Sequence, residues 1–293
     1  MFFNKLYYKE FFLKYVEDQN KFLICPVFID KSDYEQFIKP RSYKNILFLT
    51  EPIKNYSNVG QGYEYVYKGY NENAFSIIIG CINHDPANGR FKFPLYLFEN
   101  KFDIHDSEQF ARINNQVSLI DLVGLKNKSF ATLINSWDRE NGARVNMYNR
   151  LIELGNISCP GKLLNNCSNA DLNAIGKAKY INKFLFNICP ENYDYDNVPG
   201  YITEKLMDCC LSGAIPIYAG WIDEYDEKIF NTKRIICYNS QDTASYECAY
   251  AKVKELMENP DKLLEFYQQP VFCDTAHDTI QYLLQEFITC LNR

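Results

Sequence analysis

The chain has 293 residues, of which 47% are hydrophobic and 23% are charged, and its formal net charge is −6. This length accommodates one large globular domain or two modest ones. The acidic balance excludes a general nucleic-acid binder, whose affinity would need a basic face, but it leaves room for a local basic pocket.

The N-terminus is rich in aromatic residues but carries Lys5, Lys9, Glu10 and Lys14, and no uncharged apolar run of the chain is long enough to span a membrane. The apolar core and small-residue cleavage site of a signal peptide are also missing. We therefore expect a cytoplasmic protein without a transmembrane segment, whose aromatic and basic N-terminus offers a peripheral contact with a membrane. The sequence does not fix the oligomeric state.

Short apolar runs in the first part of the chain predict buried strands of a parallel sheet. These runs cover residues 22–28, 45–50 and 75–80. Residues 99–128 are polar and mixed, so we place a domain junction near residue 125.

Strand and helix patterns alternate again after this junction. Strands are predicted at 130–134, 184–188, 214–218 and 234–238, and helices at 141–154, 203–211, 245–258, 261–267 and 278–291. Alternation in two halves predicts an α/β protein with two Rossmann-like domains facing a central cleft. The predicted domains are residues 1–125 and 126–275, and the C-terminal helix of 276–293 is expected to pack back on the first domain.

The 11 cysteines form no Cys-x-x-Cys pair, and the three histidines lie far apart in the sequence. This distribution argues against a zinc site, and it favours buried, reduced thiols.

A turn-rich loop follows the predicted strand at 184–188 and leads to a helix that begins with Glu204 and Lys205. Thr203 is suited to cap this helix, and helix N-termini attract phosphate groups. In open α/β sheets, ligands bind at the carboxyl ends of strands, so this loop and helix are candidates for a binding site. A capped helix start is also a common structural feature, and by itself it leaves the function open.

Three sequence blocks in order resemble the signature of the alpha-1,3/1,4-fucosyltransferase family. They are Phe-Asn-Ile-Cys-Pro-Glu-Asn at 186–192, Gly-Tyr-Ile-Thr-Glu-Lys at 200–205 and Gly-Ala-Ile-Pro-Ile-Tyr at 213–218. Weaker similarity at 90–96, 129–151 and 161–166 extends the resemblance over roughly residues 90–270.

The resemblance implies a GT-B fold, in which residues 126–275 hold GDP-fucose and residues 1–125 hold a glycan acceptor. It implies inverting transfer of fucose to a hydroxyl of an N-acetylglucosamine or N-acetyllactosamine-type glycan, in alpha-1,3 or alpha-1,4 linkage. No cofactor is required in this view, and a divalent cation is at most stimulatory. The alternatives are a GT-B transferase that uses another nucleotide sugar, such as GDP-mannose, and a non-catalytic nucleotide- or carbohydrate-binding protein.

The resemblance also assigns roles to charged residues. Arg144 and Lys205 match the positions that neutralise the departing diphosphate, for which a guanidinium fork and an ammonium point charge are suited. The competing interpretation makes Arg144 a surface residue of a helix and Lys205 a solvated side chain.

Further positions are carried over in the same way. Glu204 matches a catalytic carboxylate near the fucose and ribose, and the matches for residues lining the donor are Glu191, Asn192 and Tyr201. An inverting transfer also needs a base that deprotonates the acceptor hydroxyl. We predict Glu51 for this role, because it follows the strand at 45–50, and Glu99 is the second candidate.

The triplet Asp194-Tyr195-Asp196 has the form of a metal-binding pair but lies in a stretch that departs from the family pattern. Two carboxylates leave most of the coordination of a hard cation unfilled. We therefore predict no metal site and interpret the triplet as part of a loop insertion. Other departures are Pro190 and the order Ala219-Gly220-Trp221, which leave the acceptor open.

Overall fold

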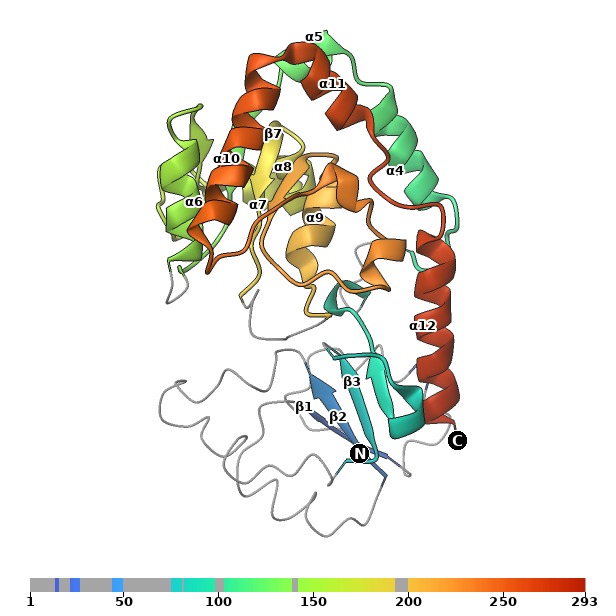
Figure 1. The fold of residues 1–293 in the computed structure, drawn as a ribbon. Coiled ribbons are helices and arrows are strands. Elements are labelled where there is room, and N and C mark those ends of the chain that lie inside the picture. The colour runs from blue at the N-terminus through green and yellow to red at the C-terminus, as the bar shows by residue number, and fades with distance from the viewer. Residues whose placement is uncertain are drawn as a thin grey trace. The chain divides into compact units, whose positions relative to one another are not determined.

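The computed structural model describes residues 14–15, 22–26, 44–49, 75–80, 82–97, 103–138, 142–192 and 200–292. The chain divides into two compact units (Figure 1). Unit 1 comprises residues 1–101, 198–201 and 280–293, and unit 2 comprises residues 102–197 and 202–279. Residues 102–125 thus belong to unit 2, whereas the polar composition had placed the junction near residue 125.

Unit 1 contains a parallel sheet with the strand order β1-β2-β3-β4. Its strands are β1 (Phe22–Pro26), β2 (Lys44–Leu49), β3 (Ile77–Gly80) and β4 (Arg90–Lys92), and the short 3-10 helices Pro86–Asn88 and Leu95–Leu97 flank β4. The apolar side chains of β2 and β3 are buried, as continuous hydrophobic runs in a parallel sheet should be. Gly80 ends β3 with φ of 128°, and a Cβ there would lie 2.1 Å from the Leu49 carbonyl oxygen.

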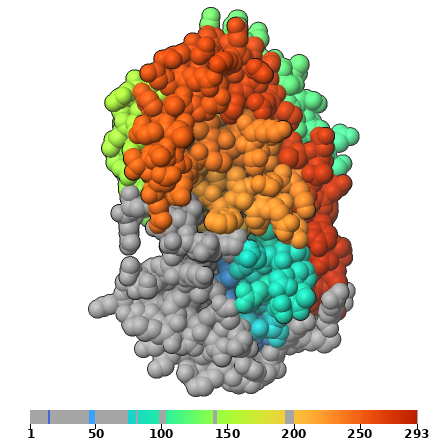
Figure 2. Space-filling view, in the orientation of Figure 1, coloured from blue at the N-terminus to red at the C-terminus, as the bar shows by residue number. Residues whose placement is uncertain are grey.

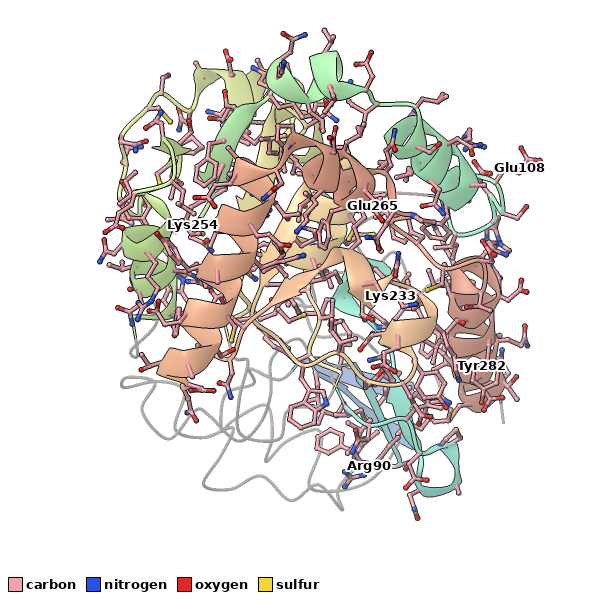
Figure 3. The ribbon with its side chains drawn as sticks, turned by 45° about the horizontal axis from the view of Figure 1, so that its top comes forward. Arg90, Glu108, Lys233, Lys254, Glu265 and Tyr282 are labelled. Carbon is pink, nitrogen blue, oxygen red and sulfur yellow. The ribbon has the colours of Figure 1, made fainter. Side chains whose placement is uncertain are left out.

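Helix α12 (Ala276–Leu291) crosses the boundary of the two residue sets, and its part from residue 280 belongs to unit 1. There the Phe287 ring lies 5.2 Å from that of Phe93. The Tyr282 ring, labelled in Figure 3, lies 5.8 Å from the His84 ring. The Phe287 contact makes the apolar face of the helix part of the core of unit 1, whereas Tyr282 is 46% exposed.

Unit 2 contains a second parallel sheet with the order β6-β5-β7-β8-β9. Its strands are β5 (Ser129–Leu133), β6 (Ile157–Ser158), β7 (Phe184–Ile188), β8 (Ile215–Tyr218) and β9 (Ile236–Cys237). The first strand, β5, has the second strand β6 on one side and the third strand β7 on the other. The winding of the chain therefore reverses between β5 and β7, which makes their carboxyl ends a topological switch point.

Helices surround the sheet of unit 2 (Figure 1). They are α4 (Gln109–Ser118), α5 (Leu122–Lys126), α6 (Ala143–Leu151), α7 (Ala170–Ile175), α8 (Lys177–Ile181), α9 (Glu204–Ser212), α10 (Thr243–Glu258) and α11 (Pro260–Gln268), with 3-10 turns at Asp226–Lys228 and Thr232–Arg234. Contacts join α8 to α9 and α6 to α10. In the space-filling view of Figure 2, the orange atoms of α10 and α11 form much of one face of this unit.

The strands and helices predicted from the sequence are confirmed, with ends that shift by a few residues. The patterns missed β4, β6, α4, α5, α7 and α8. Helix α4 illustrates one reason, because the residues that hold it in place lie far away in the sequence. The side-chain oxygen of Asn114 accepts hydrogen bonds from the backbone N–H groups of Val271 (2.8 Å) and Phe272 (3.0 Å), and the Phe110 ring lies 4.5 Å from that of Phe272.

Arg234 is a buried structural residue of unit 2, with 1% of its surface exposed. Its guanidinium donates hydrogen bonds to the carbonyl oxygens of Gly213 (2.6 Å), Ala214 (3.0 Å) and Tyr267 (3.1 Å). The same group lies 5.0 Å from the centre of the Tyr267 ring. One side chain thereby joins the end of α9, the approach to β8 and helix α11.

Within the described residues, no helix combines the length and apolar character needed to cross a bilayer. The cysteines whose side chains are described are free thiols, and Cys159, Cys189, Cys209 and Cys210 are buried.

Candidate functional site

A small pocket lies at the switch point of the sheet in unit 2. It is lined by Ile134, Asn135, Lys177, Asn187, Ile188, Cys189 and Lys205. Asn135 follows the end of β5, and Cys189 follows the end of β7, so the pocket opens where the carboxyl ends of these neighbouring strands meet. The fold of unit 2 therefore places candidate ligand-binding groups where open α/β sheets bind their ligands.

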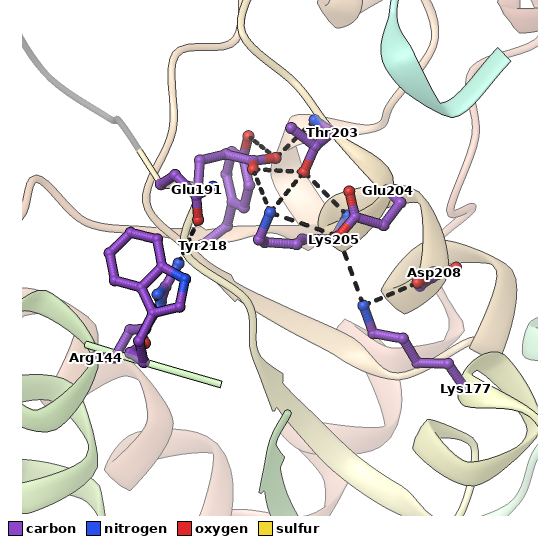
Figure 4. Close-up of polar contacts among 10 residues, drawn as sticks. Arg144, Lys177, Glu191, Thr203, Glu204, Lys205, Asp208 and Tyr218 are labelled. Atoms are coloured by element: carbon purple, nitrogen blue, oxygen red, sulfur yellow. Dashed lines mark hydrogen bonds and ion pairs between the residues drawn. The ribbon is translucent and has the colours of Figure 1, made fainter. Parts of the chain in front are cut away.

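Glu191 is the centre of a buried polar network just beyond β7 (Figure 4). Its side chain is fully buried. The carboxylate accepts hydrogen bonds from the backbone N–H of Thr203 (2.8 Å), the hydroxyl of Thr203 (2.6 Å) and the hydroxyl of Tyr218 (3.3 Å). Its own backbone N–H donates to the Ala219 carbonyl at 2.8 Å. Glu191 thus ties the start of α9 to β8.

Tyr218 remains a hydrogen-bond donor to this carboxylate. Burial of its ring raises the pKa of the hydroxyl well above the ordinary value, and the negative charge of Glu191 acts in the same direction. Burial likewise raises the pKa of the Cys189 thiol, which lines the pocket. Burial thus disfavours the thiolate form of Cys189, which is the nucleophilic form of a cysteine.

Lys205 is held at the first turn of α9 by oxygen atoms of three side chains. Its ammonium lies 2.9 Å from the Thr203 hydroxyl oxygen, 3.3 Å from Glu191 Oε2 and 3.5 Å from Glu204 Oε1. Thr203 caps the helix, since its side chain accepts a bond from the Lys205 backbone N–H at 3.4 Å. The sequence motif therefore produces a lysine that is 12% exposed and has a fixed position beside the pocket.

Glu204 extends the cluster toward α8. Its Oε1 atom lies 3.9 Å from the Lys177 ammonium, which also lies 3.0 Å from Asp208 Oδ2 (Figure 4). The Glu204 side chain is 29% exposed, whereas that of Asp208 is 3% exposed. The carboxylate of Glu204 is thus the more accessible one, and it lies between two ammonium groups.

Arg144 approaches the same strand end from α6. Its guanidinium donates to the Trp137 carbonyl oxygen at 2.6 Å and to the side-chain oxygen of Asn192 at 2.7 Å, and it lies 4.7 Å from the centre of the Trp137 ring. Its backbone N–H donates to Asp138 Oδ1 at 3.1 Å. Arg144 is 1% exposed, so stacking and hydrogen bonds fix its orientation.

Two consecutive residues connect these cationic groups, because Glu191 contacts Lys205 and Asn192 contacts Arg144. Among the described residues, the carboxylates of the cluster outnumber its cations. The cations are Arg144, Lys177 and Lys205, and the carboxylates are Asp138, Glu191, Glu204 and Asp208. An anionic ligand would accordingly be recognised by directed N–H donors more than by excess positive charge.

The structure brings five of the predicted site residues together in unit 2: Arg144, Glu191, Asn192, Glu204 and Lys205. Tyr201 is fully buried and belongs to unit 1. Both candidate bases, Glu51 and Glu99, and the triplet 194–196 lie outside the described residues. Among the residues that the structure describes, no group of three or more His, Cys, Asp or Glu side chains could hold a metal ion.

Residues 123–280, more than half of the chain, match the family model described as glycosyltransferase family 10 (fucosyltransferase) C-term. The chain belongs to this family. The matched range contains the whole cluster of unit 2, and the family predicted from the blocks at 186–192, 200–205 and 213–218 is confirmed.

A curated relative is the alpha-(1,3)-fucosyltransferase FucT of Helicobacter pylori, which is 31% identical over 100 residues. The matched residues make up 34% of this chain and only 20% of that relative's length. A solved structure of an alpha1,3-fucosyltransferase is similar over 94% of this chain and 79% of its own, with TM-score 0.62 and 18% identity. Another solved structure, described as an alpha1,3-fucosyltransferase with GDP-fucose, has a TM-score of 0.59 and 19% identity. The similarity covers 94% of this chain and 79% of that one. The predicted α/β, GT-B fold is confirmed.

Proposed function

We propose that this protein is an inverting fucosyltransferase that transfers fucose from GDP-fucose to a glycan hydroxyl in alpha-1,3 or alpha-1,4 linkage. The acceptor class in this proposal is an N-acetylglucosamine or N-acetyllactosamine-type glycan. The observation that carries it is the pair Glu191-Asn192, which holds Lys205 and Arg144 at the switch point within the range of the fucosyltransferase family match. The GDP-fucose named for a structure of the same fold supports the choice of donor.

The leaving group of this reaction is a diphosphate, and its developing negative charge must be stabilised. Arg144 offers a guanidinium whose orientation is fixed by Trp137 and Asn192, and Lys205 offers an ammonium at the first turn of α9. Helix N-termini add favourable N–H dipoles. No cofactor enters the proposal, and a divalent cation is at most stimulatory.

The chemistry balances without any further reactant. The acceptor hydroxyl oxygen forms a bond to the anomeric carbon of fucose, while the bond from that carbon to the β-phosphate oxygen breaks and its electron pair leaves with GDP. The hydroxyl proton passes to a carboxylate base, for which we propose Glu51, with Glu99 as the second candidate. Glu204 supports the positive charge that develops on the sugar ring, and Tyr201 lines the donor.

Donor binding tests the nucleotide part of the proposal. GDP at 100 times its dissociation constant should stabilise the protein by about 2.7 kcal/mol in a thermal-shift measurement. GDP-fucose should also stabilise it, whereas UDP should not. Stabilisation by UDP alone would contradict the proposal, and stabilisation by GDP-mannose in place of GDP-fucose would assign a different sugar.

The roles of the two cations are tested by replacing each with an uncharged side chain. Arg144→Met and Lys205→Met should each weaken GDP binding at least tenfold, in line with the loss of one charge-assisted hydrogen bond. Lys254→Met is the control, because Lys254 lies on α10 and is 48% exposed (Figure 3). GDP affinity equal in all three variants would rule out these roles.

The catalytic base is tested by transfer assays with the donor saturating. Glu51→Gln should nearly abolish fucose transfer and leave GDP binding intact, and the control Glu265→Gln, at an exposed residue of α11, should leave both unchanged. Full activity of Glu51→Gln with loss in Glu99→Gln would move the base to Glu99. An acceptor screen with GDP-fucose, with the linkage read by NMR, then defines the hydroxyl attacked. Cytoplasmic location with peripheral membrane contact stays a prediction.

A further inference from the structure

Lys177 occupies a position that its local structure does not favour. It is the first residue of α8 and follows Gly176, whose φ of 82° and ψ of 162° set the direction of the turn. A positive charge at a helix N-terminus opposes the helix dipole. When a protein violates a local preference, it most often does so to make a tertiary contact or at a functional site.

The tertiary contact of Lys177 is with the first two turns of α9. Its ammonium lies 3.0 Å from Asp208 Oδ2 and 3.9 Å from Glu204 Oε1. Glu204 and Asp208 are four residues apart, so their carboxylates lie on one face of α9 and repel each other. The Lys177 ammonium contacts both carboxylates and so relieves this repulsion.

The ion pair between Lys177 and Asp208 would by itself be enough to link α8 to α9. Lys177 also faces the ligand side of the cluster. It lines the switch-point pocket together with Lys205. The Glu204 Oε1 atom lies 3.5 Å from Lys205 on one side and 3.9 Å from Lys177 on the other. Figure 4 shows this arrangement, in which two ammonium groups from different helices approach one carboxylate.

We propose that Lys177 is a positioning residue that holds the Glu204 carboxylate in the orientation needed to bind the sugar of the donor. The inference rests on the proposed function, in which Glu204 serves the fucose and Arg144 and Lys205 serve the diphosphate. The inference assigns Glu204 to the fucose rather than to the ribose, so Lys177 acts on the sugar part of donor recognition and not on the nucleotide part. This division separates its role from that of a general stabiliser of the fold.

The experiment compares the affinities of GDP and GDP-fucose, measured by calorimetry, in a set of variants. Lys177→Met removes the ammonium and leaves the buried Asp208 carboxylate without it, which risks unfolding. The double variant Lys177→Met/Asp208→Asn removes that risk, and Asp208→Asn alone removes the carboxylate charge but keeps Lys177 beside Glu204. Lys177→Arg restores a cation, and Lys254→Met is the surface control.

We expect the double variant to lose about fivefold to tenfold in affinity for GDP-fucose while its affinity for GDP changes less than about twofold. Asp208→Asn should show the same ratio of GDP-fucose affinity to GDP affinity as the parent protein. Lys177→Arg should recover most of the GDP-fucose affinity that the double variant loses. Equal losses for GDP and GDP-fucose, or a loss in Asp208→Asn as large as in the double variant, would overturn the inference. Failure of the parent protein to bind GDP would instead overturn the proposed function.

Discussion

The buried carboxylate of Glu191 offers the sharpest test of how the site is assembled. Its Oε1 atom accepts from the Thr203 backbone N–H and the Tyr218 hydroxyl, and its Oε2 atom accepts from the Thr203 hydroxyl and the Lys205 ammonium. In Glu191→Gln, the carbonyl oxygen can keep the Oε1 contacts, because the backbone N–H cannot turn away. The amide NH2 group then replaces Oε2 and faces Lys205.

The cost of this change follows from which contacts survive. The Thr203 hydroxyl loses its acceptor at Oε2, and its oxygen can accept a bond from the new amide only by giving up one of its two donors, the Lys205 backbone N–H or the Lys205 ammonium. The ammonium of Lys205 loses a charged acceptor at 3.3 Å and meets N–H donors instead. Loss of one charge-assisted hydrogen bond in a site this buried costs about 2 kcal/mol. For a protein of 293 residues, that lowers the melting temperature by about 3 °C.

Calorimetric unfolding of four proteins measures the effect: the parent, Glu191→Gln, Lys205→Met and the double variant. Once Lys205 is neutral, the amide meets no ammonium, so Glu191→Gln should cost less than about 1 kcal/mol in that background. Glu265→Gln, on the exposed face of α11, is the matched control and should unfold like the parent. A Glu191→Gln cost that is the same with and without the Lys205 charge would refute the reasoning.

Two further changes probe the support of the site. Arg234→Lys should destabilise unit 2 by about 3 kcal/mol, because an ammonium cannot reproduce three bonds to carbonyl groups. The control is Arg150→Lys, because Arg150 is 28% exposed and stacks on Tyr246. This control should cost less than about 1 kcal/mol by thermal unfolding. Gly220→Ala should cost about 1–3 kcal/mol, since the added Cβ would lie 2.2 Å from the Tyr218 hydroxyl oxygen, which is bonded to Glu191. An unchanged melting temperature in either Arg234→Lys or Gly220→Ala would contradict the packing described above.

Much of the architecture is readable from local sequence because its signals are local. The strands of both sheets are continuous apolar runs, and α9 carries its own cap and stop in Thr203 and Gly213. Helix α4 was not predicted, because its polar sequence is anchored by Asn114 to residues more than 150 positions later. Helices α7 and α8 are too short for a periodic pattern to develop.

The candidate site shows the same division. The motif at 200–205 and Asn192 gave the residues that contact one another around Lys205 and Arg144. Lys177 and Trp137 were missed, since each joins the cluster only through the folded chain. The dipeptide Trp137-Asp138 shortly before a predicted helix was the one available signal, because such positions commonly hold capping and stacking side chains. Glu51, as the proposed base, still depends on the resemblance.

The pairing of α4 with the segment after α11 has a consequence for folding during synthesis. Asn114 and Phe110 find their partners at Val271 and Phe272, so the ribosome must add more than 150 residues before α4 can be fixed. At ordinary elongation rates this delay is on the order of ten seconds. During that interval Phe110 and Val117, buried in the finished protein, have no final packing partner from the C-terminal segment. The nascent chain therefore exposes α4 to aggregation or chaperone capture during this interval, well away from the residues that form the site.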